Sequence, residues 1–460
     1  MSALRSTLWA IAAVLSFSLL GAASAFSFGT ANITPGHLAI GFLLVAVFIR
    51  PNQRAKLMKP FQIGMPGLFL IAVVFWAVAS AVIMPRLFEG QVLVLGQDSK
   101  LSMLGPSSYN LNQTVYFLSG PIIFALVAAA VHSARMLDLV VRAVIAVSAL
   151  NLFLALVDVA TAAVGLESLL SFVRNAEYDQ HFGQRIMGIK RVTGVLPEPA
   201  AFAGLSAMLF AFNFTLWRAG IHSTFTGWIS LLTFVAIVFT FSSTGYVALF
   251  VFLSFAYFFA FSGFERRPQT AQKTVARNRN IFLSLIPVGA LVGAIFLAVR
   301  PDLLEPIEQL FDITVSSKLQ SESGEARTRW NMEGLRVFYE TYGLGAGAGS
   351  ARTSSFPISI LANLGIVGAL LFALFFFSFF TTKTEEKNPL IQPNQMVYAS
   401  AARAACFVNL IAALLVGVSI DLGIYFYTFA GLACATVYSN SRPAVQLRYV
   451  EQPGFEQQNT

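Results

Sequence analysis

Charged residues are scarce in this sequence. Only 11% of the 460 residues are Asp, Glu, Lys or Arg, whereas an ordinary soluble domain carries roughly 25%. Hydrophobic residues make up 56% of the chain, and the mean hydropathy is +0.70. So few charges cannot cover a water-facing surface of this size. The composition therefore excludes a soluble protein and predicts one that lies in a bilayer.

Cysteine and histidine are rare as well. The two cysteines, Cys406 and Cys434, both lie in apolar runs, which argues against an extracellular disulfide framework. The four histidines show no ligand spacing, so we assign no metal site and expect no cofactor. A net charge of +8 in a membrane protein is typical of basic cytoplasmic loops, and we expect no nucleic-acid partner.

The long apolar runs lack the two-residue alternation of membrane β-strands, as in Ile281–Val299 and Phe356–Phe380. We therefore expect an all-α, polytopic integral membrane protein. A crossing helix needs about 20 apolar residues, and on this rule the whole chain, 1–460, forms a single membrane domain with about 12 transmembrane helices. The predicted ranges are 8–26, 37–49, 65–84, 116–132, 139–164, 199–217, 226–241, 245–262, 281–299, 356–380, 398–418 and 422–438. The first range also fits a cleavable signal peptide ending near residue 25.

The basic residues of the short loops predict the orientation, because such loops lie on the cytoplasmic side. They place both termini in the cytoplasm, including a cytoplasmic tail at 439–460. Two long loops, 165–198 and 300–355, then face outward, and the second is expected to hold an amphipathic helix at 323–344. The loop residues that decide this orientation are Arg50, Arg54, Lys56, Lys59, Arg266, Arg267, Lys273, Arg277, Arg279, Lys383 and Lys387.

The first outward loop ends in Arg191-Val-Thr-Gly194-Val-Leu-Pro-Glu198-Pro199. Proline suits the first turn of a helix, and an acid is stabilising at the positive end of the helix dipole. Glu198 can therefore cap the following helix, or it can accept a proton from an incoming hydroxyl. The arginines nearby favour the second interpretation.

The second outward loop carries Arg327, Arg329 and Arg336. They can bind lipid phosphates as part of an interfacial helix. They can also form a pyrophosphate clamp, since guanidinium donates to phosphate in a planar fork. The glycine-rich run at 343–349 could bring backbone amides to the same anion. Two other outward bases, Arg174 and Arg352, are expected to tolerate lysine.

Three further features are polar exceptions in apolar surroundings. Asp158 lies deep in a predicted span, and such an acid is a functional candidate unless it fixes packing by pairing with a buried polar group. Asp421 lies at an outer junction between two spans. The polar break at 240–245 is interpreted as a turn.

Three segments together resemble the superfamily of Wzy-type O-antigen and exopolysaccharide polymerases and O-antigen ligases. They are Arg-x-x-Gly-x-x-x-Glu-Pro at 191–199, the stretch from Arg327 through Trp330 to Gly347, and Asn363-Leu-Gly365-Ile-Val-Gly368. The chain departs from the family pattern in lacking an arginine after Ser242. It also lacks the histidine that ligases place before the span at 356–380, which favours a polymerase.

The resemblance implies an enzyme of the bacterial inner membrane with a periplasmic active site. It would transfer a growing glycan from undecaprenyl pyrophosphate to a lipid-linked repeat unit, with a chain-length regulator as a candidate partner. Arg191, Arg327, Arg329 and Arg336 would bind the pyrophosphate, Glu198 would act as the base, and Asp158 and Asp421 remain additional candidates. An O-antigen ligase is one alternative. A transporter or flippase of lipid-linked sugars is the other.

Overall fold

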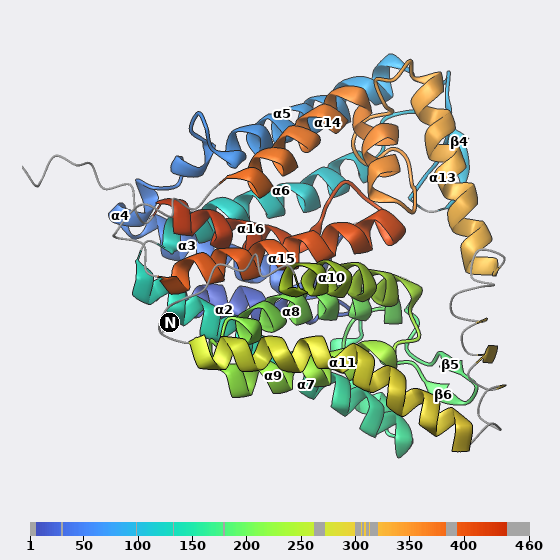
Figure 1. Ribbon diagram of the computed structural model, residues 1–460. Helices are drawn as coiled ribbons and strands as arrows, with labels where there is room; N and C mark the ends of the chain where they lie inside the picture. The colour runs from blue at the N-terminus through green and yellow to red at the C-terminus, as the bar shows by residue number, and fades with distance from the viewer. Residues whose placement is uncertain are drawn as a thin grey trace, which may run out of the picture.

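The computed structural model describes residues 6–28, 31–97, 99–131, 133–177, 180–261, 272–299, 321–382 and 393–438, with isolated positions between 305 and 312. The predicted tail at 439–460 and nearly all of 300–320 lie outside the described residues. Helices form most of the structure (Figure 1). They are α2 (Thr7–Phe17), α3 (Pro35–Phe48), α4 (Pro51–Arg54), α5 (Pro66–Leu87), α6 (Ser108–Ala130), α7 (Ala134–Ala163), α8 (Pro199–Arg218), α9 (Ser223–Val238), α10 (Ser243–Phe261), α11 (Gln272–Val299), α13 (Glu322–Glu340), α14 (Phe356–Thr381), α15 (Pro393–Val416) and α16 (Gly423–Tyr438), with short 3-10 turns at Lys59–Phe61 and Glu167–Val173.

Each predicted apolar range contains a helix. Among the described residues, eight helices are long and apolar enough to cross a membrane, namely α5, α6, α7, α8, α10, α11, α14 and α15. Helix α3 and the segment Pro51–Phe61 form a pair bent by 105°, and α2, α9 and α16 are shorter apolar helices. The chain is therefore an all-α, multi-pass membrane protein, as predicted. The number of twelve crossings stays a prediction.

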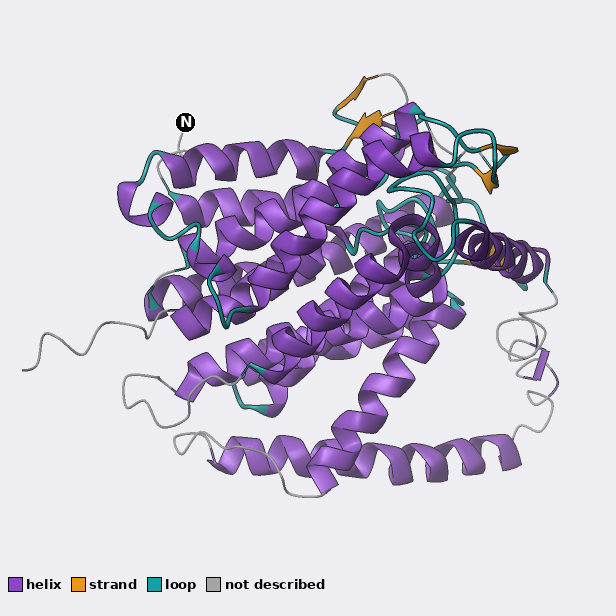
Figure 2. Ribbon diagram, turned by 90° about the horizontal axis from the view of Figure 1, so that it is seen from above, coloured by secondary structure: helices purple, strands orange, loops and turns teal. Residues whose placement is uncertain are grey.

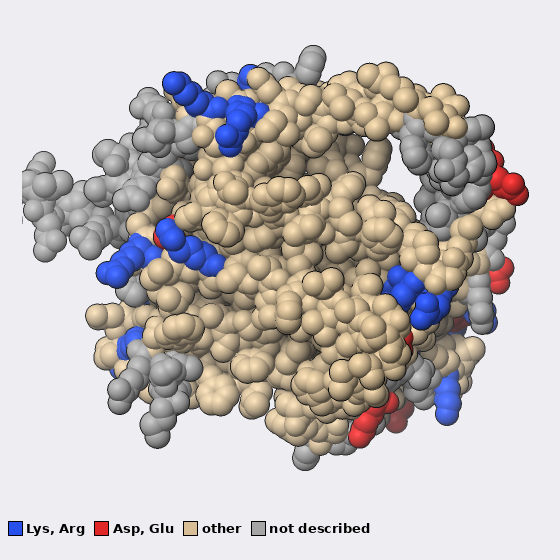
Figure 3. Space-filling model, turned by 90° about the horizontal axis from the view of Figure 1, so that it is seen from below, with Lys and Arg blue, Asp and Glu red and all other residues tan. Residues whose placement is uncertain are grey.

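The outer surface of the helices is apolar. Phe75, Phe225, Phe250 and Phe377 are each at least 70% exposed, although they belong to four different helices. On the face drawn in Figure 3, charged side chains gather towards the ends of the helices and leave a broad uncharged area between them. Exposed apolar surface of this extent marks contact with an apolar partner, and lipid chains provide it here.

Three antiparallel hairpins join helices: β1 (Phe26–Phe28) with β2 (Ala31–Ile33), β3 (Leu93–Leu95) with β4 (Leu101–Met103), and β5 (Arg185–Ile186) with β6 (Ile189–Lys190). Strands β4, β5 and β6 lie at the same end of the bundle as α13, on the right in Figure 1. We call this the loop end. Helix α4 lies at the opposite end, which we call the α4 end.

Helix α8 is the centre of the packing around the site. It packs against α9 and α15, and 72% of its most apolar 18-residue stretch is buried. Phe212 of α8 lies against Phe429 of α16, with 5.2 Å between ring centroids, and both rings are fully buried. Helix α11 is far more exposed than α8. Only 6% of its most apolar 18-residue stretch is buried, and it lies along the edge of the bundle (Figure 2). The start of α8 is therefore held firmly at the loop end.

Helix α14 is broken at Gly365, whose φ of 65° and ψ of −164° are not helical. The glycine-rich segment 343–349 fits into this break. The amide of Ile366 donates to the carbonyl of Gly343 at 2.9 Å, and the amide of Gly347 donates to the carbonyl of Asn363 at 2.9 Å. A Cβ on Gly365 would lie within 2.4 Å of backbone atoms of residues 343 and 344, so only glycine allows this approach.

Candidate functional site

Glu198 stands at the N-cap position of α8, with Pro199 as the first helical residue. Its backbone is extended, and its half-buried side chain makes no capping hydrogen bond. Among the described residues, the carboxylate has no hydrogen-bond or ion-pair partner at all. The geometry thus does not match the capping interpretation, and it leaves the carboxylate available at the loop end.

Arg191 precedes Glu198 in the same loop and is fixed by three acceptors. Its Nε donates to the carbonyl of Thr240 at 2.8 Å, and its Nη2 donates to the carbonyl of Phe241 at 3.1 Å. Its Nη1 donates to Oε1 of Gln184 at 2.6 Å. These bonds orient the guanidinium and leave part of its donor fork open.

The polar break between α9 and α10 therefore has a role that the sequence did not reveal. Its backbone carbonyls at Thr240 and Phe241, and not its hydroxyl side chains, hold Arg191. Phe241 adopts a positive φ of 48° in this turn. A carbonyl is present at every residue, so no residue pattern marks the acceptor of a particular arginine.

The charges of Glu198 and Arg327 both act on Arg191. Burial lowers the pKa of Arg191, while the negative charge of Glu198 raises it and the positive charge of Arg327 lowers it. The guanidinium stays protonated in either case, because its ordinary pKa lies far above neutrality. Two segments distant in sequence, the loop before α8 and helix α13, thus bring two arginines and one carboxylate within electrostatic range at the loop end.

Arg327 and Arg329 lie on different faces of α13. Arg327 is half-buried and lies two turns before Gly334. A Cβ on Gly334 would meet the side chains of Thr353 and Ile358, so this face of α13 packs against the bundle. Arg329 is exposed. Neither arginine has a hydrogen bond or ion pair with a described residue, but the charge of Arg327 acts on Arg191.

Arg336 is committed to contacts within α13 and with the neighbouring hairpin. It forms ion pairs with Glu333 at 2.7 Å and Glu340 at 2.8 Å, and its Nη2 donates to the carbonyl of Leu93 at 2.7 Å. These bonds attach α13 to β3. We therefore leave Arg336 out of the proposed site.

Arg174 and Arg352 both lie over aromatic rings, and their tolerance of lysine stays a prediction. The side chain of Arg174 is 6% exposed and its guanidinium lies over the ring of Phe182 at 4.1 Å. Arg352 lies over the ring of Trp330 at 4.3 Å and donates to the carbonyl of Gln97. Arg174 is buried and Arg352 is half-buried, and the sequence could not show which ring would lie against each of them.

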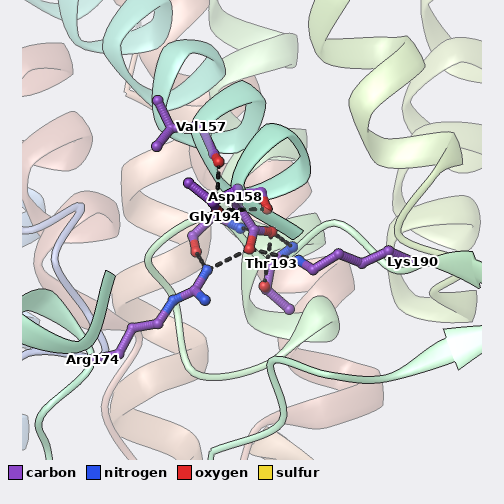
Figure 4. Close-up of polar contacts among 7 residues, drawn as sticks. Val157, Asp158, Arg174, Lys190, Thr193 and Gly194 are labelled. Atoms are coloured by element: carbon purple, nitrogen blue, oxygen red, sulfur yellow. Dashed lines mark hydrogen bonds and ion pairs between the residues drawn. The ribbon is translucent and has the colours of Figure 1, made fainter. Parts of the chain in front are cut away.

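Asp158 is the centre of a buried ionic cluster (Figure 4). It is 0% exposed, and its Oδ1 lies 2.5 Å from Nη2 of Arg174 and 2.5 Å from Nζ of Lys190. Its Oδ2 accepts from the amide and hydroxyl of Thr193 and from the amide of Gly194, each at 3.0 Å. Both oxygens are occupied, so Asp158 is not available to a substrate. These contacts favour the alternative that Asp158 fixes the packing of α7 by pairing with buried polar groups.

The cluster positions the functional loop. Lys190 directly precedes Arg191, and Gly194 lies four residues before Glu198. The bonds from Asp158 fix both points of the loop to α7, and the carbonyl of Gly194 accepts from Nη2 of Arg174. Removing one partner of a buried pair is costly because the other charge is left uncompensated. The loop therefore carries Arg191 and Glu198 on a rigid support.

Asp421 lies in the turn between α15 and α16. Its Oδ1 accepts from the amide of Gly423 at 3.0 Å, which ties the carboxylate to the start of α16. Burial raises the pKa of Asp421 to about 7. Among the described residues it has no hydrogen bond or ion pair with Arg191 or Arg327, so the structure does not join it to this site.

The glycine-rich segment cannot serve as an anion loop in this arrangement. The amide of Gly345 donates to Oγ1 of Thr341, and the amide of Ala346 donates to the carbonyl of Ala362. Ala346 and Ala348 are 0% exposed. These amides are used in closing the break of α14, which corrects the expectation that they reach a bound phosphate.

No protein-family model matches the chain, and no curated protein sequence matches it. The resemblance to Wzy-type polymerases and ligases therefore rests on the three motifs and stays a prediction. Within the described part of the chain, no group of three or more His, Cys, Asp or Glu side chains is placed to hold a metal ion.

Proposed function

We propose that this protein is a membrane glycosyltransferase that polymerises a bacterial surface polysaccharide. It transfers a growing glycan from undecaprenyl pyrophosphate to a hydroxyl of a lipid-linked repeat unit. The observation that carries the proposal is the carboxylate of Glu198, which has no partner among the described side chains and lies within electrostatic range of Arg191.

The reaction needs two groups of opposite charge. The acceptor hydroxyl attacks the anomeric carbon of the donor and loses its proton to Glu198, which acts as a general base. The bond from that carbon to the pyrophosphate oxygen breaks, and its electron pair leaves with the pyrophosphate. Arg191 and Arg327 stabilise this developing negative charge by electrostatics and hydrogen bonding.

The proposal includes a location and an orientation. The loop end faces the periplasm of the bacterial inner membrane, where lipid-linked repeat units would be joined. The helices α2, α3, α9 and α16 then cross together with the eight longer helices, giving the twelve crossings predicted from the sequence. Arg329 and Arg336 lie at the same membrane face but outside the catalytic contacts.

The decisive experiment replaces the carboxylate by an amide. Glu198→Gln keeps the shape of the side chain but cannot take a proton, so we expect polymer formation to fall by roughly 10²-fold or more. Polymer is measured by gel analysis at matched levels of membrane-inserted protein. Glu167→Gln is the control, because Glu167 is an exposed acid in the same outward loop.

Normal polymer in the Glu198→Gln variant would remove this residue from the reaction. A deletion strain separates the alternative activities. Retention of single-repeat product indicates loss of a polymerase, and loss of every capped lipid acceptor indicates loss of a ligase. Accumulation of lipid-linked repeats on the cytoplasmic side would identify a flippase and contradict the proposal.

A further inference from the structure

A large cavity lies far from the proposed active site, between α8, α9, α10 and α11. Its volume is about 1110 Å³, which exceeds the roughly 300–1,000 Å³ of ordinary small-molecule pockets. The lining is mostly aromatic and aliphatic. On the α11 side it is formed by Leu285 and Ile286, which are 56% and 58% exposed. The cavity is thus a groove that opens to the surrounding lipid.

The groove has a polar lining at the α4 end. The amide of Asn278 on α11 donates to the carbonyl of Trp217 at 2.5 Å and to the hydroxyl of Ser223 at 2.9 Å, joining α11 to α8 and α9. Arg277 lines the groove beside this contact and is exposed. Arg218 brings a second guanidinium, 5.4 Å from the ring of Phe282 in the groove wall. None of the described lining residues is acidic.

This distribution identifies the chemistry and the direction of an occupant. A hydrocarbon chain fits the aromatic walls, and an anionic head group fits the guanidinium at the α4 end. A lipid bound to Arg191 and Arg327 would have its head group at the opposite end of the helices. The charge of the groove therefore favours a lipid from the other leaflet over the chain of a glycan donor.

We propose that the groove binds one anionic glycerophospholipid from the leaflet at the α4 end. Its acyl chains fill the space between α11 and the helices α8 to α10, and its phosphate lies beside Arg277. The bound lipid completes the contact of α11 with the bundle, which protein side chains alone leave sparse. The proposal does not depend on the enzymatic activity.

The test measures lipid retained by the full-length protein after purification from native membranes in mild detergent. Native mass spectrometry and lipid extraction compare phosphatidylglycerol with phosphatidylethanolamine. We expect the wild type to retain phosphatidylglycerol in preference. Arg277→Gln should lower its retention about five-fold, the effect of one basic residue at an anionic lipid surface. Arg54→Gln is the control, since Arg54 is an exposed base on α4 outside the groove.

A second pair of variants tests the hydrocarbon site. Ser254 is exposed and lines the groove, so Ser254→Trp should fill it and reduce retained lipid. Leu370→Trp adds similar bulk at an exposed position of α14 and should leave retention unchanged. Equal retention in all variants would overturn the proposal. Three results for the wild type would also overturn it. They are equal retention of phosphatidylglycerol and phosphatidylethanolamine, a polyprenyl phosphate as the retained lipid, and a dimer that carries no lipid.

Discussion

Arg327 and Arg329 are separated by one residue on α13 but have different surroundings. The sequence gives them equal standing as phosphate ligands. Arg327 is half-buried on the face that packs against the bundle, and its charge acts on Arg191. Arg329 is exposed on the other side. The pair therefore offers an internal control for the proposed donor site.

We expect Arg327→Lys to reduce polymer formation strongly and Arg329→Lys to leave it close to wild type. A lysine keeps the charge but loses the planar fork that binds phosphate, whereas a group that only meets lipid head groups needs charge alone. Losing one such donor costs roughly 10²–10³-fold in rate. The measurement is polymer yield at matched protein level. Equal yields from the two variants would show that α13 contributes surface charge only.

The raised pKa of Asp421 leads us to expect that the free energy of unfolding depends on pH. Its pKa in the folded protein is raised to about 7, whereas an unfolded Asp titrates near ~3.9. Between these values the folded state holds more protons, so its stability falls as pH rises and levels off above about pH 7. Thermal unfolding in detergent at pH 5 and pH 8 should show a smaller decrease for Asp421→Asn than for wild type. Glu167→Gln should behave as wild type, and an unchanged decrease in Asp421→Asn would contradict the assignment.

At the scale of helices, Gly365 should be the least replaceable position of α14. Its φ of 65° and its close approach to the backbone of residues 343 and 344 leave no room for a Cβ. Gly365→Ala should lower the free energy of unfolding by at least about 1–3 kcal/mol, the cost of a strained backbone position. Gly41→Ala on α3 is the control, since a Cβ there meets no atom within 4 Å. Similar thermal stability of the two variants would show that the break in α14 is not required.

The positions of the helices could be predicted because long apolar runs are a property of neighbouring residues. The first range was too long, since α2 ends at Phe17 and the chain then enters the β1–β2 hairpin. The motif containing Arg191 and Glu198 was recognisable for the same local reason. The carbonyls that hold Arg191, and the pairing of Asp158 with Lys190, depend on long-range packing. No local pattern encodes such contacts.

At the scale of the whole molecule, we predict the orientation of the protein in the membrane. The end with α13 should face outward, and the start of α11 should face the cytoplasm. A cysteine at position 321 should react with an impermeant reagent in intact cells, and a cysteine at position 272 should react only after the membrane is opened. Native Cys406 and Cys434 are buried and give little background. The reverse labelling pattern would invert the topology and place the arginines in the cytoplasm.

The buried cluster around Asp158 also constrains how the chain is made. Arg174 follows Asp158 by 16 residues and Lys190 follows it by 32, so α7 is synthesised before either partner. Asp158 lies five residues before the end of α7, so an unpaired carboxylate there costs less than the roughly 2.5–3.5 kcal/mol of a charge at the centre of a membrane helix. Asp158 should therefore stay hydrated at the outer end of α7 until the loop that carries Arg174 and Lys190 has crossed the membrane. The final packing of the loop between α7 and α8 would then follow the translocation of both basic residues.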